Sequence, residues 1–243
     1  MAGPIVSAQV RRVMYGYFVA PEGHPNQGQP IPVSGFIVPF AGGTLLFDTG
    51  FSPIDQDTRD RYHPRQRSVA EALASAGVTT AEIDLIANCH LHADHAGGNY
   101  VFPQVRIVVQ DPELRAARRP DFTFPEYTFD YPGATLDVVS GETDLGPGLR
   151  LVPTPGHTPG HQSLLMDTDA GRWLLAGQAS DSIWKFSSEA FAARLAAEGV
   201  DDVGTYPAWM VHVREWGVER AYFAHDLMVW HRDPGEWGRP VPI

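Results

Sequence analysis

Three histidines and an aspartate lie within six consecutive residues, His90-Leu91-His92-Ala93-Asp94-His95. In an extended segment, residues two apart point to the same side, so His90 and His92 can reach one ion. If the chain then turns into a helix, Asp94 and His95 can project toward a second ion. Neutral imidazole and carboxylate groups suit zinc and related metals. Because burying these groups unpaired would be costly, the cluster predicts a metal site.

Two distant histidines have settings that suit the same site. His157 lies in a loop rich in Gly and Pro after an expected strand, and His225 follows the apolar run Ala221 to Ala224. Ligands delivered from the ends of several strands suit a preorganised metal site. We therefore predict that both are ligands. The other isolated histidines are expected to be surface residues (His24, His63, His231) or structural (His212).

The elements that must position these groups follow from apolar patterning and turn signals. Strands are expected at Val33 to Phe40, Thr44 to Asp48, Ile83 to Cys89, Val105 to Val109, Leu149 to Pro153, Ser163 to Asp167, Trp173 to Ala176 and Ala221 to Ala224. Helices are expected at Ser68 to Ala76, Glu189 to Glu198 and Pro207 to Trp216, and helix and loop at a pocket rim from Asp111 to Tyr131. Strands in both halves with helices between them suit two sheets packed face to face with helices outside. No linker separates two cores, so residues 1–243 are expected to form a single domain.

Bulk properties narrow the classes of partner and location. The formal charge of -11 weighs against nucleic acid or an anionic membrane surface as a partner. Cys89 is the only cysteine, so no intrachain disulfide can form. No apolar run resembles a signal peptide or approaches the roughly 20 residues of a membrane span. A cytoplasmic location is the default expectation, and oligomeric state is left open.

The segment His90 to Asn99 resembles the central motif of metallo-β-lactamase-fold hydrolases, and especially of N-acyl-homoserine lactonases. Three other segments are similar to family motifs in the same order: Leu45-Leu46-Phe47-Asp48-Thr49-Gly50, the run from Thr154 to Ser163, and Phe223-Ala224-His225-Asp226. The resemblance extends from about Val33 to Asp226.

The resemblance implies an α+β fold, an αββα four-layer sandwich with two metal ions at the sheet edge. By motif match, the first ion would be held by His90, His92 and His157, and the second by Asp94, His95 and His225. Asp48 would orient ligands without binding an ion itself. The alternative for Asp48 is a turn-forming residue before Thr49 and Gly50.

One departure from the family pattern concerns the second ion. Gln178 stands where the resemblance leads us to expect an aspartate that bridges the two ions. A neutral amide is a weaker ligand, so Gln178 is only a tentative one, and a single ion is the alternative to two. Asp181 falls where similar lactonases place a tyrosine that contacts substrate, and it could instead replace the missing ligand. Both could also be ordinary loop residues.

The chemistry implied is metal-assisted hydrolysis of an ester-type bond. Zinc would lower the pKa of a bound water from about 15.7 toward 7. Asp94 would pass a proton to the leaving alkoxide. Trp184, Phe186 and Tyr127 are candidates to line an acyl pocket, although aromatic residues more often pack in a core.

Three hypotheses follow for the function. The leading one is a lactonase that opens N-acyl homoserine lactones and so degrades quorum signals. The second is a hydrolase of the same fold acting on another ester, a thioester or a phosphoester. The third is a metal-binding domain without catalytic activity.

Overall fold

The computed structural model describes residues 3–24, 26–51, 56–119, 122 and 126–232. Its strands are β1 (Arg11–Val19), β2 (Pro30–Phe40), β3 (Gly43–Phe47), β4 (Arg65–Gln66), β5 (Leu85–Ala87), β6 (Arg106–Gln110), β7 (Thr135–Val139), β8 (Thr143–Gly146), β9 (Leu149–Pro153), β10 (Gln162–Thr168), β11 (Gly171–Gly177), β12 (Arg220–Phe223) and β13 (Val229–His231). Its α-helices are α1 (Gln56–Tyr62), α2 (Val69–Ser75), α3 (Ala93–Ala96), α4 (Asp111–Ala117), α5 (Glu126–Phe129), α6 (Ile183–Ala197) and α7 (His212–Glu215). Short 3-10 helices are η1 (Ser7–Gln9), η2 (Thr80–Glu82), η3 (Asn99–Val101) and η4 (Ala208–Val211).

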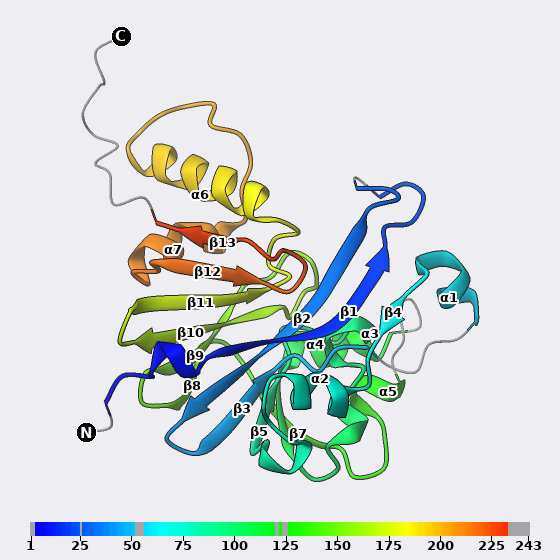
Figure 1. Ribbon diagram of the computed structural model, residues 1–243. Helices are drawn as coiled ribbons and strands as arrows, with labels where there is room; N and C mark the ends of the chain where they lie inside the picture. The colour runs from blue at the N-terminus through cyan, green and yellow to red at the C-terminus, as the bar shows by residue number, and fades with distance from the viewer. Residues whose placement is uncertain (1–2, 25, 52–55, 120–121, 123–125, 233–243) are drawn as a thin grey trace.

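The strands form two mixed sheets (Figure 1). One has the order β4-β1-β2-β3-β5-β6-β7, and the other has the order β13-β12-β11-β10-β9-β8. Antiparallel hairpins build most of the second sheet, whereas β3, β5, β6 and β7 are parallel to one another. Parallel strands need crossovers, and these carry the short helices on the outer face of the first sheet.

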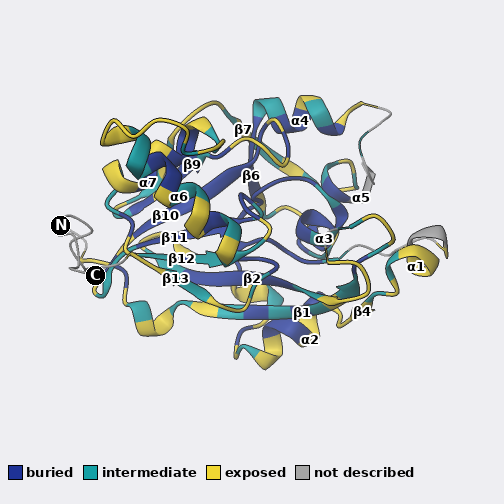
Figure 2. Cartoon of the chain, turned by 90° about the horizontal axis from the view of Figure 1, so that it is seen from above, coloured by how far each residue is buried: buried dark blue, intermediate teal, exposed yellow. Residues whose placement is uncertain are grey.

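Side chains alternate between the two faces of each strand, so one set packs in the core between the sheets and the other packs in the core under the helices. In β3, Leu45 and Phe47 pack between the sheets, whereas Leu46 packs with Leu73 of α2 on the opposite face. In β10, Leu164 packs between the sheets, whereas Leu165 packs on the opposite face, in the cluster that includes Phe186 of α6. This is the two-residue period of a strand with both faces covered. Figure 2 shows the strands mostly buried, with exposed residues on the outer sides of the helices.

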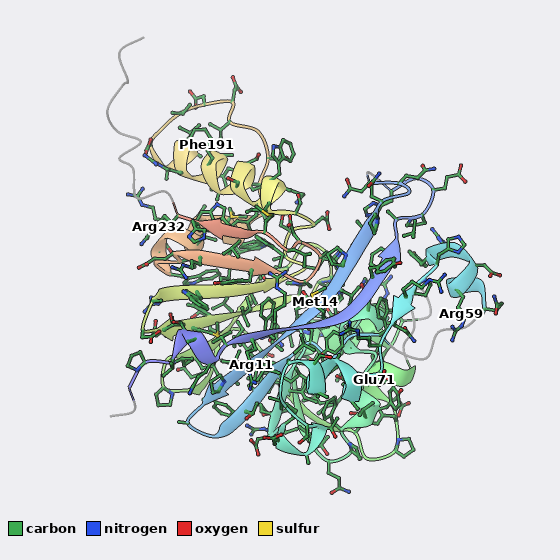
Figure 3. The ribbon with its side chains drawn as sticks, in the orientation of Figure 1. Arg11, Met14, Arg59, Glu71, Phe191 and Arg232 are labelled. Atoms are coloured by element: carbon green, nitrogen blue, oxygen red, sulfur yellow. The ribbon has the colours of Figure 1, made fainter. Side chains whose placement is uncertain are left out.

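Helices α2 and α6 belong to the two outer layers. Ser68 begins α2 with a capping box, in which its side chain and that of Glu71 each bond the other residue's backbone N–H. On the other side, Phe186 of α6 packs against Phe223 of β12 and against Trp209. Figure 3 marks these layers by Glu71 on α2 and Phe191 on α6. The order helix, sheet, sheet, helix confirms the predicted αββα sandwich.

Several elements differ from the sequence expectations. The long strand β1 was not predicted, nor were β7 and β8, and α6 begins at Ile183, six residues before the expected start. In β1 the register shifts between Met14 and Gly16, so a bulge breaks the alternation by which a strand is recognised. None of the helices in the described part of the chain is long and apolar enough to cross a membrane.

Candidate metal centre

Three histidines, the first trio, converge beyond the end of β5. They are His90, His92 and His157, and one ring nitrogen from each lies within 4.8 Å of the others. His90 and His92 follow β5, whereas His157 comes from the loop between β9 and β10. Nδ1 of His92 lies 3.1 Å from Nε2 of His157. The structure thus brings together residues from both sheets, as the resemblance implied.

A second trio, Asp94, His95 and His225, lies beside the first. His92 takes an extended conformation and is the N-cap of α3, so the chain turns after it and Asp94 enters the first helical turn. His225 follows β12 and places its Nε2 3.0 Å from Nε2 of His95. Asp94 Oδ2 lies 3.5 Å from the same atom of His95 and 3.3 Å from that of His225. The expected switch from extended chain to helix inside the motif is therefore present.

Two hydrogen bonds outside the second trio determine which ring nitrogens carry protons. Nδ1 of His225 lies 2.8 Å from the carbonyl oxygen of Pro32, which can only accept, so Nδ1 donates. Nδ1 of His95 lies 3.0 Å from Oδ2 of the buried Asp48 and donates to this carboxylate. The other oxygen of Asp48 accepts from the backbone N–H of Cys89, at 2.8 Å. In the neutral rings, Nε2 of His95 and Nε2 of His225 are therefore both lone-pair atoms.

Burial makes the first trio neutral. It lowers the pKa of His92 and that of His157 to about 4. It also lowers the pKa of His90 well below its ordinary value, and the neighbouring His95 adds to this effect. Neutral imidazoles are the form that binds metals, so at neutral pH no proton must leave the first trio before an ion can enter.

The second trio contains the negative charge of the site. Burial alone would raise the pKa of Asp94, but His95 and His225 outweigh it and the pKa is lowered. Burial alone would lower the pKa of His95, but Asp94 and Asp48 outweigh it and the pKa is raised. Asp94 is therefore an ionised carboxylate that faces two imidazoles.

The arrangement of donor atoms fits a metal ion at each trio. Nε2 of His90 is buried and has no hydrogen-bond partner among the described residues. The Nε2 atoms of His95 and His225 face each other as lone pairs, which is unfavourable unless a cation or a proton lies between them. Imidazole nitrogens and a carboxylate are a metal-ligand set of the kind found in open hydrolytic sites. A bound cation would satisfy these atoms together.

Gln178 and Asp181 lie beside the second trio. Oε1 of Gln178 is 3.1 Å from Nε2 of His95, so the amide oxygen reaches the atom that faces the site. Nε2 of Gln178 donates to Oδ1 of Asp181 at 3.5 Å. The fully buried His161 accepts from the backbone N–H of Gln178, at 3.1 Å, and its Nδ1 lies 2.8 Å from the hydroxyl of Thr154. His161 thereby ties the Gln178 turn to the loop that carries His157.

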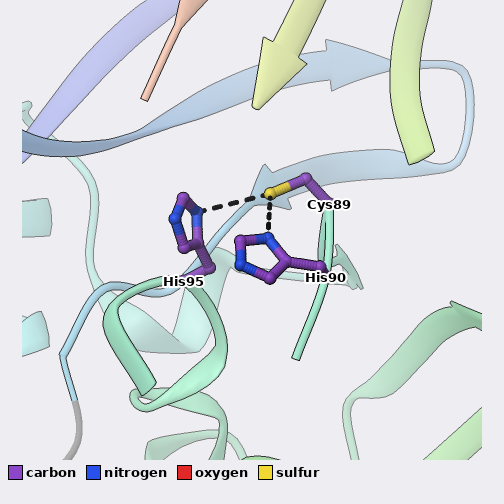
Figure 4. Close-up of side chains that lie close together, drawn as sticks. All are labelled: Cys89, His90 and His95. Carbon is purple, nitrogen blue, oxygen red and sulfur yellow. Dashed lines mark hydrogen bonds between the residues drawn. The ribbon is translucent and has the colours of Figure 1, made fainter. Parts of the chain in front are cut away.

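Residues outside the predicted set complete the surroundings of the trios. Cys89 Sγ lies 3.1 Å from Nδ1 of His90 and 3.3 Å from Nδ1 of His95, so it contacts one member of each trio (Figure 4). Burial raises the pKa of the Cys89 thiol well above its ordinary value, so it stays protonated. Glu113 is also fully buried and bonds the loops on both sides of the first trio. For Cys89, the only feature of the sequence that could have indicated a place at the site was its position next to His90. For Glu113, the sequence held no such indication.

A pocket of about 500 Å³ opens over the trios. Asp94, His92 and His157 are among the residues that line it. Its aromatic walls are Phe18, Phe51 and Tyr62, and its polar lining includes Glu22, His24, Arg61, Gln178 and Asp181. His24, expected to be an ordinary surface residue, therefore contributes to this pocket. A mixed aromatic and polar lining of this kind is typical of a small-molecule pocket.

Two of the aromatic candidates for an acyl pocket, Phe186 and Trp184, lie elsewhere. Phe186 is fully buried in the core beneath α6, so the core alternative holds for it and it does not line the pocket. Trp184 is 76% exposed and lines a different cavity, between α6 and β13. The side chain of Tyr127 lies outside the described residues. An apolar residue in a helix packs more often in the core than in a pocket, and periodicity could not separate the two.

Comparison with known proteins agrees with this geometry. Residues 29–180, more than half of the chain, match the Metallo-beta-lactamase superfamily. The chain belongs to this superfamily. It is 30% identical over 178 residues to an N-acyl homoserine lactonase of a Bacillus species, a match that covers 68% of this chain and 70% of the relative.

Solved structures of this superfamily share the fold. An N-acyl homoserine lactone hydrolase with N-hexanoyl-L-homoserine bound at its catalytic metal centre aligns with a TM-score of 0.72 and 23% identity, covering 93% of this chain and 95% of the other. AidC, a dizinc quorum-quenching lactonase, aligns with a TM-score of 0.64 and 16% identity, covering 93% and 92%. The prediction of a metal-dependent hydrolase with a metallo-β-lactamase fold is confirmed.

Proposed function

We propose that this hydrolase opens the ring of N-acyl homoserine lactones, and that zinc is its metal. The first ion would be held by His90, His92 and His157, whose ring nitrogens lie close together. The second would be held by Asp94, His95 and His225, with Gln178 Oε1 as a further weak ligand. The proposal is supported most by one observation: members of both trios, His92, His157 and Asp94, line the same pocket as three aromatic side chains. The relatives named above support the lactone as substrate.

Zinc supplies two things at such a site: a water of lowered pKa, so that hydroxide is available at neutral pH, and polarisation of the ester carbonyl. The protein supplies the remaining functions. Asp94 is ionised and lies at the pocket, with Oδ2 directed to the second trio. The carboxylate of Asp94 would take up the proton of the attacking water and deliver it to the alkoxide that leaves as the ring opens. Asp48 keeps Nε2 of His95 directed at the ion through the bond to Nδ1.

The pocket suits a neutral ester with an apolar chain. Its volume falls in the range of roughly 300–1,000 Å³ that is usual for small-molecule sites. Phe18, Phe51 and Tyr62 offer aromatic surface for an acyl chain, and Phe18 packs edge-on to His225 with ring centroids 5.7 Å apart. An acyl chain that lies against Phe18 is therefore next to the second trio.

A second candidate is hydrolysis of another carboxylic ester or a thioester, and it is favoured by the Gln178 and Asp181 pair. Glu22, Asp94 and Asp181 all line the pocket, with Arg61 as the one guanidinium among its described lining residues. Three carboxyl groups repel an anionic substrate electrostatically, so a phosphoester is a less favourable substrate for this pocket than a neutral ester.

The test is hydrolysis of N-hexanoyl homoserine lactone by zinc-loaded protein, followed as release of acid. The His92→Ala variant should lose turnover because the first trio is then incomplete. His231→Ala, an exposed histidine on β13, is the matched control and should keep it. An aryl ester and a phosphodiester are measured in parallel. No lactone turnover by the wild type, with rapid turnover of the aryl ester, would replace the lactonase assignment by the second candidate.

A further inference from the structure

Glu113 lies in the first turn of α4, and within the described part of the chain its side-chain hydrogen bonds reach the two loops that carry the first trio. Oε1 accepts from the backbone N–H of Leu91 at 2.9 Å. Oε2 accepts from the hydroxyl of Thr158 at 2.6 Å and from the backbone N–H of Gly160 at 3.1 Å. The side chain is fully buried, so these three bonds replace all contact with water. One carboxylate therefore joins segments that are far apart in the chain.

The bonded groups are the immediate neighbours of the ligands. Leu91 is the residue between His90 and His92, so a bond to its N–H holds the peptide that joins them. Thr158 follows His157 directly. The two oxygens of Glu113 thus hold the two sides of the first trio at a fixed separation.

Close packing reinforces this link. A Cβ atom at Gly160 would lie 2.1 Å from the backbone nitrogen of Glu113, so only glycine allows the His157 loop to approach α4 this closely. Both carboxylate oxygens are needed as acceptors, because one N–H approaches each of them. An amide at position 113 would place its NH₂ group against one of these donors.

The fold has a second connection between the same segments. Gln162, at the start of β10, donates from its backbone N–H to the carbonyl of Cys89 and from its side chain to that of Asn88, both at 2.8 Å. Loss of Glu113 therefore leaves the strand ends joined and acts on the loops beyond them.

We propose that Glu113 is a positioning residue, which sets the separation of His157 from His90 and His92 and so determines the zinc affinity of the first trio. This rests on the proposed function only in that the first trio holds a metal ion. Glu113 belongs to neither trio and is not among the described residues that line the pocket, so it would act through the two loops that it joins.

The experiment is a titration of metal-free full-length protein with zinc against a competing chelator, and with Co²⁺ followed by visible absorption. Glu113→Gln should lower zinc affinity about 10–100-fold, the usual effect of losing a residue that orients ligands, and should change the Co²⁺ spectrum. Thr158→Val removes one hydroxyl donor and should act in the same direction, whereas Thr158→Ser should restore wild-type behaviour. Asp111→Asn, on the same helix but paired with Arg115 at the surface, is the matched control and should match the wild type.

Unchanged zinc affinity and an unchanged Co²⁺ spectrum in Glu113→Gln would overturn the proposal, even with a lower melting temperature, because a purely structural role predicts that result. If Glu113→Gln does not fold, the Thr158→Val and Thr158→Ser pair decides, and equal zinc binding by both overturns it. No substrate is present, so a wild type that binds zinc but opens no lactone refutes the proposed function while leaving this result interpretable.

Discussion

Replacing Asp48 by Asn tests whether a carboxylate outside the two trios controls the second ion. Asp48 uses one oxygen for the backbone N–H of Cys89 and the other for Nδ1 of His95. Asn keeps the size of the side chain. It also tolerates the left-handed backbone at this position, where φ is 63°. The change therefore acts on charge and hydrogen bonding with little backbone strain.

The amide has only one oxygen, so one of the two bonds must fail. If its NH₂ group faces His95, Nδ1 of the ring must accept and Nε2 then carries the proton, so Nε2 no longer binds a metal. If the NH₂ group faces Cys89, two buried donors meet, at a cost of about 1–3 kcal/mol. The first outcome lowers metal affinity by about 10–100-fold, as for other residues that orient histidine ligands. The second outcome lowers the melting temperature.

The assay is zinc competition with a chromophoric chelator, beside thermal unfolding of the metal-free protein. Asp137→Asn, which removes a half-exposed carboxylate paired with Arg106 on the surface, is the control and should leave both quantities unchanged. A variant at Asp48 that binds two zinc ions as tightly as the wild type and melts at the same temperature would refute the reasoning, because both alternatives would then be absent.

Two other predictions concern charge at the trios. Gln178→Asp should increase the affinity for the more weakly bound zinc ion, because a carboxylate replaces an amide oxygen that lies 3.1 Å from His95 Nε2. The zinc content measured after dialysis should rise to two ions per chain. An unchanged zinc content would show that the amide does not limit metal binding. The metal-free protein should lose stability as the pH falls from 6.5 to about 4, because burial lowers the pKa of His92 and His157 and the unfolded chain takes up protons first. Urea unfolding at a series of pH values measures this, and a flat midpoint across that range would contradict the burial of neutral imidazoles.

The sequence could predict the parts of the site that are local. His90 to His95 form one short segment, so their convergence needs only an extended stretch and a turn into α3, both of which are present. His157 and His225 are far from that segment; their settings after strands favoured them as ligands, and the resemblance to a family assigned each of them to one of the two ions. Glu113 could not be found, because its partners lie 22, 45 and 47 residues away and a lone Glu at a helix start is usually exposed.

The fold shows the same division between local and non-local information. Strands β2, β3 and β10 contain short apolar runs bounded by polar or turn residues and were predicted close to their observed bounds. Strand β1 contains two arginines and a bulge, and Arg12 is held by partners distant in the chain: it stacks 5.2 Å from the ring of Phe36 and donates to the carbonyl of Asp226. A strand that is stabilised by such distant contacts lacks the local alternation of apolar and polar residues from which strands are predicted.

The metal centre also joins the two sheets. Each trio takes two members from the segment after β5, in the first sheet, and one from the second sheet, namely His157 after β9 or His225 after β12. An ion bound at either trio would therefore link the two sheets at the ends of β5, β9 and β12. Because such an ion binds the assembled sandwich and not the unfolded chain, its binding free energy adds to the stability of the fold. By the same linkage, a change that separates the sheets weakens metal binding without altering any ligand.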